Sequence, residues 1–237
     1  MSFNNDFYIQ NNYAKFTQNI LELISSMKKG KFIVFEGIDG SGKSTISNML
    51  YEKLNEQTGN IYKTFEPTDS PIGSVIKNIL NKRIVSDDKT IGALFLADRL
   101  DHIQNPVTGM LNYLEKGVHV ISDRYYYSSY AYHVPMLSMD WVIRANSVCA
   151  DLLRPDVVFF FDISVDESMR RLNASRKFHD LFETREKMEQ VSKNYKKAIE
   201  REGKKDNVII IDGHKRVDEI FDEVWKITAK LIEIGIN

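Results

Sequence analysis

Several features that place proteins in membranes or oxidising compartments are missing from this sequence. It has a single cysteine, Cys149, in 237 residues, so no intrachain disulfide can form and nothing indicates an oxidising compartment. No run of about 18 apolar residues is present, which argues against a membrane-spanning helix. Residues 1–12 are rich in asparagine and carry no basic cluster, unlike a signal or transit peptide. We therefore expect a cytoplasmic protein without a membrane partner.

An excess of charge of one sign is also missing. The 32 lysines and arginines nearly balance the 33 acids, for a formal charge of −1. The whole chain therefore does not attract a polyanion, and no nucleic-acid partner is expected. The five histidines show no metal-ligand spacing, so we expect no metal site built by the protein alone. Any phosphate binding must be local.

What the chain does contain is a regular alternation of two kinds of segment. Short runs rich in Val, Ile and Phe lie between longer segments with helical periodicity. Continuous apolar runs such as 157–161 are typical of strands covered on both faces. The alternation predicts an α/β fold, a five-stranded parallel sheet with helices on both faces, whose ligands bind beyond the carboxyl ends of the strands. The expected strands are 31–36, 60–65, 118–122, 157–162 and 208–212.

A glycine-rich segment follows the first expected strand and opens an expected helix. Residues 37–45 fit the pattern G-x-x-x-x-G-K-[ST]. Glycines allow close approach of the backbone, so successive N–H groups and the helix N-terminus can hold a phosphate. Lys43 adds a positive charge and the Ser44 hydroxyl can reach Mg²⁺. The sequence therefore predicts a P-loop NTPase fold, with ATP bound by Gly37, Ile38, Asp39, Gly40, Ser41, Gly42, Lys43, Ser44 and Thr45.

Two other P-loop classes need residues that this chain does not have. A guanine-reading Asn-Lys-x-Asp is absent, because Asn81-Lys82 is followed by Arg-Ile. Motor and helicase ATPases usually end a strand in Asp-Glu, whereas Asp123 precedes Arg124 here. An arginine at that place suits a second anionic substrate, and Asp123 can hold Mg²⁺ through water. These residues favour a nucleotide kinase.

Two segments are candidates for the second substrate site. Phe95 and Arg99 are four residues apart in a helical segment, so they share one face and could together stack on a base and bond its carbonyl. Taken alone, the pair would also fit a core phenylalanine and a surface ion pair. The segment 125–132 adds tyrosines and serines beside Arg124.

With these segments in order, the chain resembles the thymidylate kinase family from about residue 31 to its C-terminus. The resemblance rests on residues 35–45, Glu66-Pro67-Thr68, residues 94–99, residues 123–125 with their Ser/Tyr tail, and Arg-Pro-Asp at 154–156. It implies transfer of the ATP γ-phosphate to dTMP, giving dTDP and ADP, with Mg²⁺ between the phosphates, in a homodimer. A kinase with broader deoxynucleoside monophosphate or deoxynucleoside acceptance is the first alternative. A nucleotide-binding regulatory protein that kept the fold is the second.

The resemblance also implies roles for individual residues. Phe95 would stack on thymine, Arg99 would bond the base carbonyl, and Tyr132 would lie against the sugar. Phe65 stands where many relatives carry arginine, so the acceptor phosphate would depend more on Arg124. The residues expected to bind dTMP are Glu66, Pro67, Phe95, Arg99, Arg124, Ser128, Ser129 and Tyr132.

Phosphoryl transfer requires mainly positioning and positive charge. Some thymidylate kinases place an arginine within the P-loop, where this chain has Gly40-Ser41. Relatives that lack it use a mobile lid, and the basic segment 170–177 falls within such a lid, about 168–184; a solvated basic helix is the alternative. The predicted catalytic residues are Asp39, Lys43, Arg124, Arg171 and Arg176.

Residues 1–30 are expected to form an N-terminal helical extension to a domain of residues 31–237. Phe16, Ile20, Ile24 and Met27 recur at spacings of three and four, as in one apolar helical stripe. This stripe would pack on the domain or contact a second chain.

Overall fold

The computed structural model describes residues 29–133, 137–175 and 184–234. In this part of the chain, all strands belong to one parallel sheet with the order β2-β3-β1-β4-β5. The predicted five-stranded parallel α/β fold is confirmed, with strand ends within one residue of the expected ranges. The strands are β1 (Phe32–Glu36), β2 (Ile61–Phe65), β3 (His119–Asp123), β4 (Val157–Asp162) and β5 (Val208–Asp212). The apolar stripe of the expected N-terminal extension lies outside the described residues.

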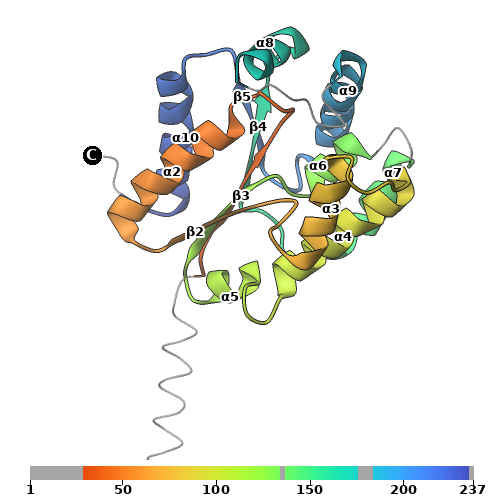
Figure 1. The fold of residues 1–237 in the computed structure, drawn as a ribbon. Helices are drawn as coiled ribbons and strands as arrows, with labels where there is room; N and C mark the ends of the chain where they lie inside the picture. The colour runs from red at the N-terminus through yellow and green to blue at the C-terminus, as the bar shows by residue number, and fades with distance from the viewer. Residues whose placement is uncertain (1–28, 134–136, 176–183, 235–237) are drawn as a thin grey trace, which may run out of the picture.

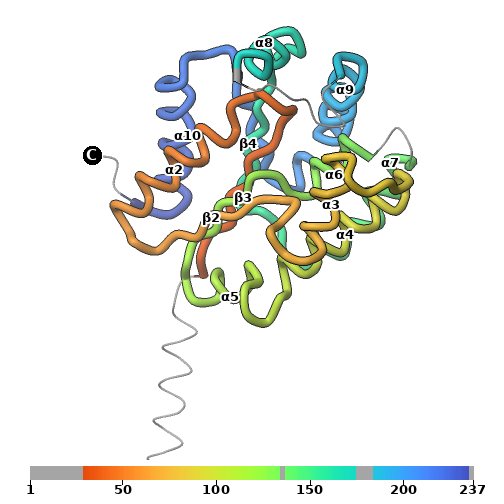
Figure 2. The backbone as a smooth tube through the Cα atoms, in the orientation of Figure 1, coloured from red at the N-terminus to blue at the C-terminus, as the bar shows by residue number. Residues whose placement is uncertain are grey.

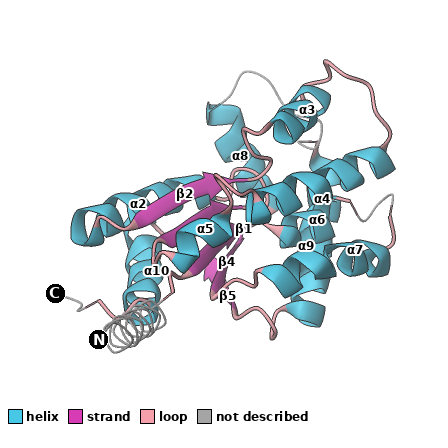
Figure 3. Ribbon diagram, turned by 90° about the horizontal axis from the view of Figure 1, so that it is seen from below, coloured by secondary structure: helices cyan, strands magenta, loops and turns pink. Residues whose placement is uncertain are grey.

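Helices cover both faces of the sheet (Figures 1 and 3). Helices α2 and α10 lie on one face, and α4, α5, α6, α7 and α9 lie toward the other. The described helices are α2 (Lys43–Thr58), α3 (Pro71–Leu80), α4 (Asp88–Gln104), α5 (Met110–Glu115), α6 (Tyr126–Tyr132), α7 (Met139–Leu152), α8 (Val165–Ser175), α9 (Arg185–Glu202) and α10 (Val217–Leu231).

The central strands are buried on both sides, which explains their continuous apolar sequence. Successive side chains point to opposite faces of a sheet. In β1, Ile33 and Phe35 therefore join the core under α2 and α10, while Phe32 and Val34 join the core on the other side. Each such fully buried side chain contributes about 1.5–3 kcal/mol. This burial fixes the sheet as the rigid base of the molecule.

The polar loops collect at the carboxyl ends of the strands. The P-loop joins β1 to α2, Arg124 joins β3 to α6, and the Glu66 loop joins β2 to α3. Helix α8 begins shortly after β4 and lies at the same end of the sheet as the P-loop (Figure 2). The Ser168 hydroxyl on α8 donates a hydrogen bond to the Asp39 carbonyl, which ties this helix to the P-loop.

Candidate active site

The P-loop has the backbone shape that its glycines predict. Gly40 and Gly42 have φ values of 76° and 96°, a region that favours glycine. A Cβ on Gly40 would lie 2.8 Å from the Ser168 carbonyl oxygen, so a larger residue would clash with α8. Gly42 is the N-cap residue just before α2 and has no side chain to cap the helix. The N–H groups of the first turn can therefore bind an anion.

The P-loop borders a cavity of about 480 Å³, here called the P-loop cavity. Arg171 on α8 lines it and is held by Glu167 (2.8 Å) and the Gly213 carbonyl (2.9 Å). Of the two predicted lid arginines, Arg171 therefore lines this cavity. Arg176 lies outside the described residues. The lining residues are Asp39, Gly40, Ser41, Gly42, Lys43, Ser44, Thr45, Ile46, Phe161, Glu167, Arg170, Arg171, Leu172, Lys215, Val217 and Ile220.

Lys43 is a buried cation whose ammonium group faces polar atoms. Its Nζ donates to the Ile38 carbonyl oxygen at 2.9 Å. Burial and the nearby Arg124 guanidinium lower the pKa of Lys43 to about 8, although Asp39 and Asp123 act in the opposite direction. The side chain is therefore charged at pH 7 but poorly neutralised, a state that a phosphate would relieve.

Asp39 and Arg124 form an ion pair between the P-loop and the end of β3. Tyr132 completes the group, because its hydroxyl donates to Asp39 Oδ2 at 2.9 Å and accepts from Arg124 at 3.2 Å. Burial alone would raise the pKa of Asp39, but Arg124 and Lys43 outweigh it and lower that pKa to about 2. Asp39 is therefore ionised, and it fixes the position of the Arg124 guanidinium. Arg124 has a φ of 72°, an uncommon conformation for a residue with a Cβ and one that clusters at functional sites.

A second, smaller cavity of about 160 Å³ lies beyond Arg124, here called the aromatic cavity. Phe95 forms part of its wall, with its ring centroid 5.0 Å from that of His133. Burial, followed by the charge of Arg99, lowers the pKa of His133 to about 4, so this imidazole is neutral at pH 7. The lining residues are Asp39, Pro67, Leu80, Phe95, Arg124, Ser128, Ser129, Tyr132 and His133.

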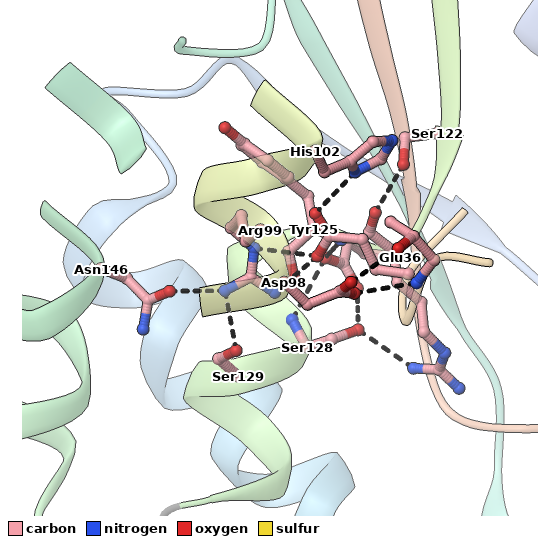
Figure 4. A network of polar contacts seen from close by, with 12 residues as sticks. Glu36, Asp98, Arg99, His102, Ser122, Tyr125, Ser128, Ser129 and Asn146 are labelled. Carbon is pink, nitrogen blue, oxygen red and sulfur yellow. Dashed lines mark hydrogen bonds and ion pairs between the residues drawn. The ribbon is translucent and has the colours of Figure 1, made fainter. Parts of the chain in front are cut away.

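Arg99 does not line this cavity and is fully buried. Figure 4 shows it among its hydrogen-bond partners, which include Ser129 and Asn146. An arginine has five N–H donors. Two are directed at Glu66 Oε2, at 2.8 and 2.6 Å, and one at the Tyr125 carbonyl. The remaining two are directed at Ser129 and Asn146. Direct contact of Arg99 with a base stays a prediction, and it would require one of these bonds to open.

Ser129 connects the buried arginine to the aromatic cavity. Its Oγ accepts from Arg99 at 2.9 Å and lines the cavity. No acceptor for its own O–H occurs in the part of the chain that the structure describes. The hydroxyl can therefore donate to a ligand carbonyl while Arg99 polarises it.

The loop after β2 is held by Asp98, one residue before Arg99. Its carboxylate accepts from the Thr68 N–H at 2.8 Å, the Thr68 hydroxyl at 2.6 Å and the Ser70 hydroxyl at 3.0 Å. Ser70 in turn caps α3 through the Gly73 N–H. Helix α4 thus positions the Pro67 wall of the aromatic cavity by side-chain hydrogen bonds.

Glu36, at the end of β1, holds the start of α6 and Tyr195 of α9 by hydrogen bonds (Figure 4). Its buried carboxylate accepts from the Tyr125 and Ser128 N–H groups at 2.8 and 3.1 Å. The Ser128 and Tyr195 hydroxyls also donate to it, at 2.7 and 2.9 Å. Burial raises the pKa of Glu36, and these donors act against that shift. The network fixes Ser128, which accepts from Arg124 at 3.0 Å.

A third cavity, of about 510 Å³, lies between the other two and is here called the bridging cavity. It shares Lys43 and Ser44 with the P-loop cavity and Arg124 with the aromatic cavity, while Asp39 lines all three. A phosphoryl group passing from a P-loop ligand to a ligand of Arg124 would cross this space. Its lining residues are Asp39, Lys43, Ser44, Lys63, Thr64, Phe65, Glu66, Asp123 and Arg124.

The bridging cavity has donors that suit Mg²⁺. Ser44 and Asp123 both line it, and buried Asp123 Oδ1 has no hydrogen-bond partner among the described residues. An unpartnered carboxylate oxygen is costly, and oxygen ligands are those that Mg²⁺ prefers. The predicted metal residues, Ser44 and Asp123, therefore fit a water-rich Mg²⁺ site held largely by phosphates.

Sequence reasoning missed residues that come from distant segments. His133 and Leu80 line the aromatic cavity, and Asn146 and Tyr195 hold Arg99 and Glu36 from behind. His133 directly follows the Ser/Tyr segment 125–132, so its neighbours in the sequence could have indicated that it lies at the site. Asn146 and Tyr195 carry no local signal, because their roles arise from the packing of α7 and α9.

A P-loop cavity joined through a bridging cavity to a second, arginine-lined site defines a class, the P-loop nucleotide kinases. The family model of thymidylate kinases matches residues 35–224. The chain is 35% identical over 202 residues to a probable thymidylate kinase from Pyrococcus abyssi, covering 83% of this chain and 94% of that protein. It is 38% identical over 181 residues to one from Thermococcus kodakarensis, covering 71% and 84%. The chain belongs to the thymidylate kinase family.

The fold is also similar to a solved structure, the thymidylate kinase of Candida albicans. The TM-score is 0.69 with 23% sequence identity, over 88% of this chain and 96% of that one. This likeness supports the fold. In the described residues, no helix is long and apolar enough to cross a membrane.

Proposed function

We propose that this protein transfers the γ-phosphate of ATP to dTMP and releases dTDP and ADP. ATP would lie in the P-loop cavity and dTMP in the aromatic cavity, with its phosphate on Arg124. The observation that carries the proposal is the bridging cavity, whose walls belong to both sites. Membership of the thymidylate kinase family supports the choice of acceptor.

The reaction needs no strong base, because the acceptor phosphate oxygen is already ionised near neutral pH. That oxygen forms a bond to the γ-phosphorus while the bond to the ADP oxygen breaks, and ADP keeps the electron pair. Lys43 and Arg124 border the space where this occurs, and Asp39 holds Arg124 in place. Bound Mg²⁺, held by Ser44 and Asp123 with the phosphates, would neutralise part of the charge. Arg171 supplies a further cation on the ATP side.

The aromatic cavity would hold the base of the acceptor, and membership of the thymidylate kinase family supports a pyrimidine there. The Phe95 ring offers a stacking face. The Ser129 hydroxyl and the neutral His133 imidazole can donate or accept at the edge of the base. Tyr132 lines the cavity next to Arg124, and we expect its ring to lie against the sugar.

An acceptor panel tests this function. ADP release would be measured with ATP, Mg²⁺ and each of dTMP, dUMP, dCMP, dGMP and thymidine. We expect the highest kcat/KM with dTMP and none with thymidine, since thymidine has no phosphate for Arg124. A higher kcat/KM with another acceptor would support the broader kinase, and no turnover with any acceptor would support a regulatory protein.

The family resemblance implies a homodimer, and we propose that the two chains pair through α7. Trp141, Val148 and Leu152 are exposed by 41%, 43% and 37%. Their spacings of seven and four place them on one helix face. Another face of α7, which includes Val142, Asn146 and Cys149, is buried, and α7 packs against α4 and α6. An apolar helix face left exposed is the kind of surface that a second copy covers.

Val148→Glu should convert the dimer to a monomer, because a charge would be buried in the apolar contact. Light scattering after gel filtration should give twice the chain mass of 27.4 kDa for the wild type and one chain mass for the variant. Val107→Glu is the control, since Val107 is 80% exposed in a loop away from α7. A monomeric wild type would contradict the dimer, and a dimeric variant would contradict this face. The cytoplasmic location stays a prediction, which cell fractionation would test.

A further inference from the structure

Lys63, in the middle of β2, lies in the bridging cavity although no sequence motif includes it. In the β2–β3 pairing, Lys63 is opposite Ile121 and Phe65 is opposite Asp123. Ile121 belongs to the core under α2 and α10, so Lys63 projects to that face of the sheet. This is the face on which α2 presents the residues that follow the P-loop.

The resting partner of Lys63 is on α2. Its Nζ donates to Oδ1 of Asn48, which is four residues after Ser44 and therefore on the same helix face. Lys63 thus reaches the second turn of α2 from β2. It lines the bridging cavity together with Ser44 and Asp123.

Some charged groups around the bridging cavity are in ion pairs, and others are hydrogen-bonded only to neutral groups. Arg124 is paired with Asp39, and Glu66 is paired with Arg99. Lys43 and Lys63 instead donate to neutral oxygens, of Ile38 and Asn48. In the described part of the chain, neither lysine has a carboxylate within ion-pair distance. Both cations therefore face the cavity with charge that a phosphate could use.

We propose that Lys63 is a further phosphate-binding residue of the transfer reaction. When both nucleotides are bound, its ammonium group leaves Asn48 and contacts a non-bridging phosphate oxygen in the bridging cavity. Phe65, two residues later on the same strand face, also lines this cavity but carries no charge, so Lys63 is the residue of β2 that supplies a cation there. The inference rests on the proposed transfer between the two cavities.

The test compares Lys63→Gln with Lys63→Arg and Asn48→Ala. Lys63→Gln should lower kcat about 10- to 100-fold, because a cation placed where charge develops acts mainly in the transition state. KM for ATP and for dTMP should change less than about threefold by the same argument. Lys63→Arg should recover most of kcat, and Asn48→Ala should retain it because the cation remains.

A binding measurement separates this role from a structural one. With ADP, aluminium fluoride, Mg²⁺ and dTMP, a mimic of the transferring phosphoryl group, Lys63→Gln should bind about tenfold more weakly than the wild type. Its affinity for ADP alone and its thermal midpoint should be unchanged. Equal kcat and equal affinity for the mimic would overturn the proposal, as would a loss that follows a lowered thermal midpoint. If the wild type prefers another acceptor, the proposed function fails separately and the same comparison is made with that acceptor.

Discussion

Lys43→Met is expected to lower kcat/KM by at least about 10³-fold, the range seen when a cation on the transferring phosphoryl group is lost. Methionine keeps most of the side-chain volume in the buried P-loop site but carries no charge. The variant should still fold, because the ammonium group is poorly neutralised by its surroundings, and burial and Arg124 lower its pKa to about 8. Coupled ADP-release kinetics and urea unfolding would measure the two effects.

The separation of the two effects makes this prediction informative. We expect the free energy of unfolding of Lys43→Met to equal or exceed that of the wild type, since a buried charge is removed. Lys89→Met, at an exposed position on α4, is the matched control and should change neither quantity. Activity within tenfold of the wild type, in a folded variant, would show that the P-loop cavity does not hold the transferred phosphate.

Arg99→Ala is expected to lower the free energy of unfolding by about 3–5 kcal/mol, because it leaves the buried carboxylate of Glu66 without its cation. Both side chains are almost fully buried, at 1% and 2% exposure, so water cannot replace the lost bonds. The change should also raise KM for dTMP more than KM for ATP, since Ser129 loses its partner. Urea unfolding followed by circular dichroism gives the first quantity and kinetics at low temperature give the second.

Two comparisons make the Arg99 result interpretable. Arg83→Ala removes an exposed arginine and should change stability by less than about 0.5 kcal/mol. The double variant Glu66→Gln/Arg99→Ala should lose less free energy of unfolding than the two single variants lose in sum, because the residues form one ion pair. If Arg99→Ala left the unfolding curve unchanged and raised only KM for dTMP, the structural role would be contradicted and Arg99 would act only in binding the base.

The sequence predicted the strand, glycine-rich loop and helix of the P-loop well because that segment is local. Residues 37–45 are contiguous, and their glycines and helix N-terminus fix the backbone almost independently of the rest of the chain. The strands were recognisable for a similar reason, because burial on both faces requires continuous apolar runs such as β4. The second substrate site is assembled from three strand ends and three helices, so its residues could be proposed only through the family resemblance.

Arg99 shows most clearly what a spacing pattern leaves open. Its distance of four residues from Phe95 indicated one shared helix face, but only Phe95 lines the second site. The pattern could not show that Glu66, Ser129, Tyr125 and Asn146, up to 47 residues away, use all five donors of its guanidinium. Hydrogen-bond partners at such separations depend on how helices pack, and packing leaves no periodic trace in the sequence.

By itself, then, the sequence determined the α/β fold, the P-loop and the class of chemistry, because each depends on short-range backbone preferences and on contiguous residues. Only the tertiary structure decided which cations face the space between the two cavities. It left Arg99 out of the lining of the aromatic cavity, and it placed Lys63, which belongs to no motif, at the bridging cavity. The physical reason is that strand register and helix packing decide what a side chain meets, and both are set by contacts between residues distant in sequence.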